Sequence, residues 1–177
     1  MKGKKYANYI DTYPDFPIPN VFFRDIFPLI AEVSVFKEMI EKLADKSKSL
    51  SPDKILSVEA RGFIIGTALS LEMGISMLPA RKKGKLPGEK VSYEYKLEYG
   101  TSTLQIMRNA IKPGERVLLA DDVLATGGTT HAAIRLIKAA GGVPVGLASL
   151  IELTFLKGRK LIEDKTFQVI SLVEYDE

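Results

Sequence analysis

The chain has no cysteine and only one histidine in 177 residues. Without cysteine it cannot be a disulfide scaffold, a zinc protein with cysteine ligands or a thiol enzyme. Its basic N-terminus is not followed by the apolar segment of a secretion signal, and no apolar run approaches the roughly 20 residues that a membrane span needs. We therefore expect a cytoplasmic protein with no membrane partner.

The excess of one sign of charge over the other is also small. The net charge is only +3 with 27% charged residues, so the chain lacks the broad basic surface that binds nucleic acid. With 46% hydrophobic residues it can bury one core, and it is too short for two full domains. We expect a single domain over residues 1–177 and no nucleic-acid partner.

The most informative stretch is residues 117–130. An apolar segment of strand type leads into Asp121 and Asp122, and a loop containing Gly127 and Gly128 then opens a helical pattern. Ligands bind beyond the carboxyl ends of strands in open α/β sheets, so the aspartates mark a predicted site. The glycines let backbone N–H groups converge at the start of the helix, which suits a phosphate monoester. No lysine follows the glycines and no Gly-x-Gly-x-x-Gly follows a strand, which excludes a P-loop and a dinucleotide fingerprint.

Two further segments supply candidate cations. Glu59-Ala60-Arg61-Gly62 follows a predicted strand, so Arg61 and the Gly62 backbone lie at another strand end and can bind a second anion. Residues 81–85 form a basic loop before two alternating segments that predict a β-hairpin. A charge run is usually a solvated face, but a basic loop followed by a hairpin also makes a suitable lid.

Periodicity along the rest of the chain predicts an α/β fold. Helical patterns cover residues 34–45, 63–73, 130–140 and 156–163, with Ser34 as a candidate N-cap, Gly74 as a stop and His131 on an exposed helix face. Strand patterns cover residues 55–58, 75–79, 91–95, 103–106, 117–120, 143–151 and 167–173. Prolines make residues 14–20 extended. We expect a mainly parallel twisted sheet with helices on both faces, closed by a small N-terminal segment (residues 1–33) and the hairpin lid (residues 81–106).

Together these motifs resemble a known family. Residues 117–130 are similar to the phosphoribosyl-pyrophosphate (PRPP) binding signature of the type I phosphoribosyltransferases. Phe-Arg-Asp-Ile after a Pro-rich turn, and Tyr95-x-Leu97-Glu98-Tyr99-Gly100 after the basic loop, resemble the adenine-binding hood and the flexible catalytic loop of the adenine phosphoribosyltransferases. Residues 152–159 match a late segment of the family, and the resemblance covers residues 13–174. Asn20 stands where the family commonly has glycine.

The resemblance implies a role for each matched residue. The catalytic groups would be Arg61, Glu98, Asp121 and Asp122, with the aspartates on the ribose hydroxyls and Glu98 exchanging a proton with nitrogen 7 of adenine. The 5′-phosphate would be bound by Ala125, Thr126, Gly127, Gly128, Thr129 and Thr130. Pyrophosphate would be bound by Ala60, Arg61, Gly62, Arg81, Lys82 and Lys85. Adenine would be bound by Phe22, Phe23, Arg24 and Val123.

The implied reaction converts adenine and PRPP to AMP and pyrophosphate. Mg²⁺ would be the cofactor, held mainly by the substrate with no direct protein ligand, and the family is usually homodimeric. Two alternatives stay open: a phosphoribosyltransferase for hypoxanthine, guanine, xanthine or orotate, and a non-catalytic PRPP sensor that binds DNA. The hairpin motif argues against the first, and the lack of a winged helix and of a basic excess argues against the second.

Overall fold

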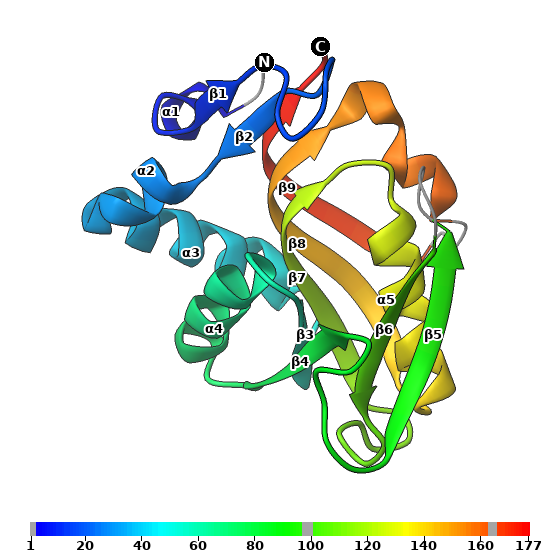
Figure 1. Cartoon of the computed structure of the whole chain (residues 1–177). Helices are drawn as coiled ribbons and strands as arrows, with labels where there is room; N and C mark the ends of the chain where they lie inside the picture. The colour runs from blue at the N-terminus through cyan, green and yellow to red at the C-terminus, as the bar shows by residue number, and fades with distance from the viewer. Residues whose placement is uncertain (1–2, 97–100, 163–165) are drawn as a thin grey trace.

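The computed structural model describes residues 3–96, 101–162 and 166–177 (Figure 1). Its helices are α1 (Lys4–Ala7), α2 (Phe27–Ala31), α3 (Val33–Lys48), α4 (Gly62–Met73) and α5 (Gly128–Ala139). Its strands are β1 (Asp11–Tyr13), β2 (Phe23–Asp25), β3 (Lys54–Val58), β4 (Ser76–Lys82), β5 (Lys90–Lys96), β6 (Thr101–Met107), β7 (Arg116–Leu124), β8 (Val143–Leu153) and β9 (Gln168–Tyr175).

One large sheet organises the described part of the chain. Its strand order is β5-β6-β4-β3-β7-β8-β9, in which β4, β3, β7, β8 and β9 run parallel and β6 is antiparallel to both of its neighbours. Figure 1 shows α3 and α4 on one face of this sheet and α5 on the other. The predicted fold class, a mainly parallel sheet with helices on both faces, is confirmed.

The central strands are buried on both faces. Ile55 and Leu118 pack in the hydrophobic cluster that contains α3 and α4, whereas Leu56 and Leu119 pack in the cluster that contains α5. Successive side chains of a strand point to opposite faces, so both faces of β3 and β7 must be apolar. This double burial explains why the two segments read as continuous apolar runs.

β7 continues through the acidic pair that was predicted to follow it. Its pairing with β3 stops at Ala120, opposite Ser57, while its pairing with β8 continues to Leu124. Asp121 and Asp122 therefore stand on a strand that has lost its neighbour on one side. The space beside them is open to the segment that follows β3.

Several predicted boundaries differ from the structure. α3 begins at Val33 with Glu32 as its N-cap, and Ser34 instead donates a 3.0 Å hydrogen bond from Oγ to the Glu32 carboxylate. α4 ends as predicted, with Gly74 in the left-handed conformation (φ 66°). The helix predicted over residues 156–163 is replaced by two short 3₁₀ helices, Thr154–Leu156 and Gly158–Leu161. Lys157 between them has a φ of 55°, which interrupts a continuous helix.

The N-terminal segment forms a small two-stranded sheet. β1 and β2 pair antiparallel, and residues 14–20 between them turn instead of running extended, because Asp15 and Asn20 have positive φ values of 56° and 66°. Asn20 N–H donates a 2.8 Å hydrogen bond to the Asp15 carboxylate, which closes the turn. Asn20, which stands where the family commonly has glycine, thus adopts the left-handed conformation that asparagine tolerates better than most residues.

The predicted hairpin is present, but the basic segment before it is not wholly a loop. β5 and β6 form the hairpin, and β4 runs on through Arg81 and Lys82, which pair with Gln105 and Leu104 of β6. Long-range pairing therefore holds these two cations on a strand, which corrects the prediction of a loop from residue 81. Among the described residues, no helix is long and apolar enough to cross a membrane.

Candidate active site

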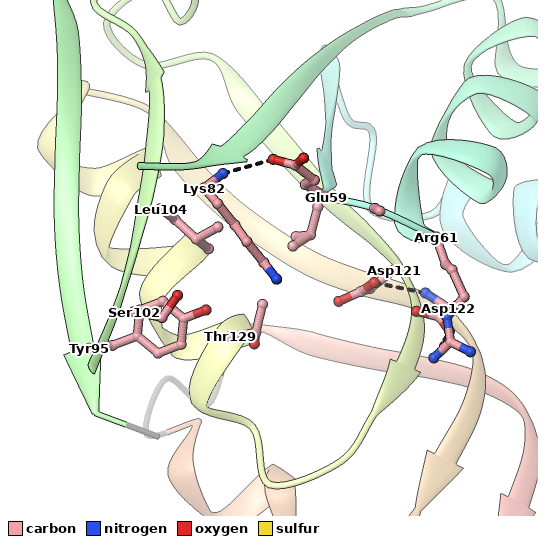
Figure 2. A pocket seen from close by; sticks show the side chains of 11 residues that line it. Glu59, Arg61, Lys82, Tyr95, Ser102, Leu104, Asp121, Asp122 and Thr129 are labelled. Atoms are coloured by element: carbon pink, nitrogen blue, oxygen red, sulfur yellow. Dashed lines mark hydrogen bonds and ion pairs between the residues drawn. The ribbon is translucent and has the colours of Figure 1, made fainter. Parts of the chain in front are cut away.

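A cavity of about 340 Å³ lies at the carboxyl ends of β3 and β7 and beneath the hairpin (Figure 2). Six residues predicted from the sequence line it: Ala60, Arg61, Lys82, Asp121, Asp122 and Thr129. Its remaining lining residues are Val58, Glu59, Tyr95, Ser102 and Leu104. The structure therefore brings together the acidic pair and cations from two separate segments of the chain.

A second cavity, of 130 Å³, adjoins the first. It is lined by Asp121, Val123, Ala125, Thr126, Gly127, Gly128, Thr129 and Thr130, so it contains the whole predicted phosphate loop. Asp121 and Thr129 line both cavities. A ligand that carries a phosphate and a sugar can thus reach the loop and the acidic pair together.

The predicted phosphate loop ends at the N-terminus of α5. Gly127 is the N-cap, with a φ of 85°, and no side chain caps this end of the helix. The first N–H groups of a helix have no partner within it, and they carry the positive end of the helix dipole. The loop and the first turn of α5 therefore offer a backbone site for an anion.

The two aspartates of the acidic pair have different surroundings. Asp122 is buried, and its Oδ2 lies 2.8 Å from Nη2 of Arg61, while its backbone N–H donates to Asp121 Oδ1 at 2.9 Å. Burial raises the pKa of the Asp121 carboxyl well above its ordinary value, and the negative charge of Asp122 raises it further. The Asp121 side chain points into the cavity, whereas Asp122 is paired with Arg61 (Figure 2).

Glycine at position 62 lets α4 approach this pair. A Cβ on Gly62 would lie 2.8 Å from Asp121 Oδ1 and 3.1 Å from the carbonyl oxygen of Ala120. Any larger residue would push the helix away from β7, so Gly62 serves close approach. Its predicted contact with pyrophosphate stays a prediction.

Arg61 connects three parts of the site. Besides the ion pair with Asp122, its guanidinium carbon lies 4.7 Å from the centroid of the Phe23 ring, and its Nη1 donates to the carbonyl oxygen of Arg24 at 3.4 Å. Arg61 thus links the segment after β3 to the acidic pair and to the N-terminal sheet.

Glu59 has a role that the sequence analysis did not assign. Its carboxylate accepts two 3.3 Å hydrogen bonds from the Arg81 guanidinium and a 2.9 Å hydrogen bond from the backbone N–H of Lys82. The Arg81 hydrogen bonds, followed by that of Lys82, lower the pKa of Glu59. Arg81 is therefore turned to Glu59, while Lys82 points its amine into the cavity (Figure 2). The signal available in the sequence was an acid directly after a predicted strand.

The predicted adenine residues of the N-terminal sheet do not line either cavity. Phe22 is exposed, and the Phe23 ring packs against Phe16 at a centroid distance of 5.2 Å. The Arg24 guanidinium donates to Thr12 Oγ1 at 2.6 Å and stacks on Tyr175, 4.0 Å from the ring centroid.

Lys85, which was predicted to bind pyrophosphate, does not line either cavity. Lys85 lies in the turn after β4, where its N–H donates to the Lys82 carbonyl oxygen. Glu98 is one of residues 97–100, which lie outside the described part of the chain.

Comparison with known proteins agrees with this arrangement. The model of the phosphoribosyl transferase domain matches residues 29–176. Over 169 residues the chain is 47% identical to an adenine phosphoribosyltransferase from a Roseiflexus species, covering 96% of this chain and 97% of that protein. The crystal structure of adenine phosphoribosyltransferase from Thermoanaerobacter pseudethanolicus gives a TM-score of 0.94 at 41% identity, covering 97% and 99% of the two chains. The enzyme of Saccharomyces cerevisiae, crystallised with adenine and an imino-altritol bisphosphate, gives a TM-score of 0.89 at 33% identity, covering 96% and 97%.

A parallel sheet that carries an acidic pair beside a backbone anion cradle defines a phosphoribosyltransferase, which is the class of the matching domain. The relatives that match nearly the whole chain are adenine phosphoribosyltransferases, one group within this class. The chain belongs to the adenine phosphoribosyltransferase family, as the sequence motifs predicted.

Proposed function

We propose that this chain transfers the phosphoribosyl group of PRPP to nitrogen 9 of adenine, giving AMP and pyrophosphate. The observation that carries the proposal is the pair of adjoining cavities, because Asp121 and Thr129 line both the acidic site and the anion cradle. The relatives of nearly full length are named for this activity, and the yeast relative was crystallised with adenine.

The acidic pair suits the ribose. Breaking the bond between the anomeric carbon and pyrophosphate builds positive charge on the sugar and negative charge on the leaving group. Asp121 and Asp122 would hold the ribose hydroxyls and stabilise the positive charge. Because the pKa of Asp121 is raised, a nearby positive charge favours the ionised form of this carboxyl when the charge develops.

The loop before α5 suits the 5′-phosphate. Ala125, Thr126, Gly127, Gly128, Thr129 and Thr130 line the smaller cavity together. Their backbone N–H groups and the positive end of the helix would hold the phosphate while the reaction takes place at the other end of the ribose.

The cations of the larger cavity suit pyrophosphate. Arg61 and Lys82 line the larger cavity, with Ala60 and Gly62 beside Arg61. Pyrophosphate binding would draw Arg61 away from Asp122, since both anions compete for the same guanidinium. Arg81 and Lys85 do not line the cavity. Contact with pyrophosphate would require the Arg81 side chain to leave Glu59 and the turn that contains Lys85 to move.

Phe23 and Val123 would hold the adenine ring, with the Phe22 backbone reading its edge. The support is the contact of Phe23 with Arg61 and the place of Val123 in the smaller cavity. Arg24 would act through its backbone, because Thr12 and Tyr175 engage its side chain. Glu98 would exchange the proton on nitrogen 7 of the base.

Mg²⁺ would enter with the substrate. No group of three or more His, Asp or Glu side chains suited to a metal ion is found in residues 3–96, 101–162 and 166–177. Mg²⁺ prefers oxygen ligands, and the phosphates of PRPP would supply most of them, so the substrate would hold the ion beside the carboxylates of Asp121 and Asp122. When bound, the ion would neutralise charge on the leaving group.

A single domain over residues 1–177, a homodimer and a cytoplasmic location complete the proposal. The homodimer is supported by an apolar groove between α3 and α4 that contains the exposed side chains of Val33 and Leu71. Sedimentation velocity tests this part directly, because a monomer at micromolar concentration would contradict it.

The decisive experiment mixes the purified chain with radiolabelled adenine, PRPP and Mg²⁺. We expect AMP and pyrophosphate in equal amounts, and no AMP when EDTA removes the metal. Parallel reactions with hypoxanthine, guanine, xanthine and orotate test the choice of base. A chain that uses one of these in preference to adenine would contradict the proposal.

A further inference from the structure

Residues 152–159 carry the sequence Glu-Leu-Thr-Phe-Leu-Lys-Gly-Arg, to which the proposed reaction assigns no role. The segment leaves the end of β8 through a short 3₁₀ helix and turns at Lys157, whose φ is 55°. Gly158 follows in a buried position. The turn thus directs the backbone at Gly158 into the molecule, next to the phosphate loop.

The backbones of Gly158 and of the phosphate loop lie in direct contact. A Cβ on Gly158 would lie 2.2 Å from the carbonyl oxygen of Ala125 and 3.0 Å from the backbone nitrogen of Gly127. A Cβ on Gly127 would lie 2.4 Å from the carbonyl oxygen of Gly158. No side chain fits on either side of this contact. Gly158 does not have the positive φ of Gly127, so space alone requires glycine there.

An ion pair fastens the segment to the sheet. Arg159 donates from Nε and Nη2 to the two carboxylate oxygens of Glu152, at 2.6 Å each, and from Nη1 to the carbonyl oxygen of Val169 at 3.2 Å. Glu152 is 3% exposed and also accepts a 2.8 Å hydrogen bond from Ser171 Oγ. Such a two-pronged pair fixes the orientation of Arg159, and with it the position of Gly158 beside it.

The same ion pair controls charge near the predicted phosphate site. Glu152 on β8 lies opposite Leu124 on β7, and Leu124 immediately precedes the loop. A buried carboxylate without this cation beside it would be costly and would also repel an anion bound at the loop. Arg159 neutralises the charge of Glu152 without lining the smaller cavity itself.

We propose that Gly158 and the Glu152–Arg159 pair are positioning residues for the 5′-phosphate. None of the three lines the smaller cavity, but together they hold the backbone of residues 125–128 in the shape that binds the phosphate. A loop held in its binding shape loses less conformational freedom when the ligand binds. The inference rests on the proposed function, in which this loop binds the 5′-phosphate.

Two ligands separate a positioning role from general damage to the fold. Ribose 5-phosphate tests the phosphate loop, and pyrophosphate with Mg²⁺ tests the cations of the larger cavity. In Gly158→Ala we expect the Kd for ribose 5-phosphate, measured by calorimetry, to rise at least tenfold, because the Cβ displaces Ala125. The Kd for pyrophosphate should stay within twofold of the parent, and the KM for PRPP should rise while that for adenine does not.

Gly114→Ala is the matched control. A Cβ on Gly114 has no atom within 4 Å, and its φ of 83° makes the same substitution conformationally strained at the opposite end of β7. Both Kd values should stay within twofold of the parent in this variant. Since Gly158 has no positive φ, the control is the more strained backbone substitution, and it separates the contact with the loop from a general loss of stability.

Arg159→Lys is a second variant, in case Gly158→Ala does not fold. Lysine keeps the charge but cannot make the two-pronged contact, so the Kd for ribose 5-phosphate should rise severalfold. In Arg159→Met, which takes the guanidinium away from Glu152, the rise should be larger, and adding Glu152→Gln should reverse part of it.

Parallel weakening of both ligands in Gly158→Ala and Arg159→Lys would overturn the inference, and so would unchanged binding of ribose 5-phosphate. Either outcome leaves the proposed reaction intact if the parent chain makes AMP. A parent chain that binds ribose 5-phosphate but makes no AMP would contradict the proposed function, and the binding comparison would still decide the inference.

Discussion

The guanidinium of Arg61 lies over the ring of Phe23, with its carbon 4.7 Å from the ring centroid, while its Nη2 is 2.8 Å from Asp122. One side chain thus contacts a residue predicted to bind adenine and a residue predicted to bind ribose. A guanidinium over an aromatic face is worth about 0.5–2 kcal/mol. The contact therefore ties the N-terminal sheet to the catalytic edge of the large sheet.

The first prediction concerns Phe23. Phe23→Ala should raise the KM for adenine at least severalfold and leave the KM for PRPP nearly unchanged, because stacking is worth roughly 0.5–1.5 kcal/mol beyond area burial. Steady-state kinetics with each substrate varied in turn measures both values. Phe22→Ala is the control, since only the backbone of this exposed residue is assigned to the base. Equal effects of the two substitutions on adenine would contradict the stacking role.

The second prediction concerns Asp122. Asp122→Asn should lower kcat more than it weakens the binding of AMP, because the carboxylate acts on charge that develops only during the reaction. Rapid-quench kinetics and AMP titration give the two quantities. If kcat and AMP affinity fall by the same factor, the residue only binds the ribose.

The third prediction concerns the pH dependence of stability. The folded protein holds the proton of Asp121 more tightly than the unfolded chain, since the pKa of Asp121 is raised. The free energy of unfolding therefore decreases as pH rises from the ordinary carboxyl range through the raised pKa. Asp121→Asn, which carries no such proton, should melt at a higher temperature than the parent at neutral pH, with the difference shrinking toward pH ~4.

Thermal unfolding between acidic and neutral pH measures this difference. Asp11→Asn provides the control, because Asp11 is an exposed carboxyl on β1, far from the acidic pair along the chain. A melting difference for Asp121→Asn that stays constant with pH would show that the carboxyl has an ordinary pKa.

The fourth prediction concerns Glu98. Glu98→Leu should lower kcat by roughly 10²–10⁴, the usual range for general acid–base catalysis, and Glu98→Gln should have a milder effect because the amide still hydrogen-bonds the base. Melting temperatures should scarcely change in either variant. A kcat for Glu98→Leu within about threefold of the parent would remove Glu98 from the mechanism.

The sequence predicted elements whose signals are local. β3 and α4 lie within one residue of their predicted bounds, because an apolar strand, a glycine stop and helical periodicity are all encoded over a few neighbouring residues. The sequence also located the predicted phosphate loop, whose contiguous glycines and threonines line one cavity; its binding of phosphate stays a prediction. The order of the strands in the sheet could not be assigned from the sequence, because it depends on pairing between segments far apart in the chain.

Features that depend on distant partners were missed. β4 extends to Lys82 only because β6 pairs with it, and Arg81 turns to Glu59 rather than to the cavity. A basic run in the sequence cannot show which of its cations has an acidic partner in another segment. The left-handed conformation of Lys157 could not be predicted either, since lysine is not a residue that signals a positive φ.

The contacts of Arg24 join the start of the chain to its end, two segments that the ribosome synthesises first and last. Its guanidinium stacks on Tyr175 and donates to the carbonyl oxygen of Glu177 at 3.2 Å, although β2 lies within the first 25 residues. A nascent chain emerges from the ribosome N-terminus first, so Arg24 of β2 cannot make these contacts until β9 has been synthesised. The first sheet to be synthesised therefore makes its Arg24 contacts only after the last strand is complete.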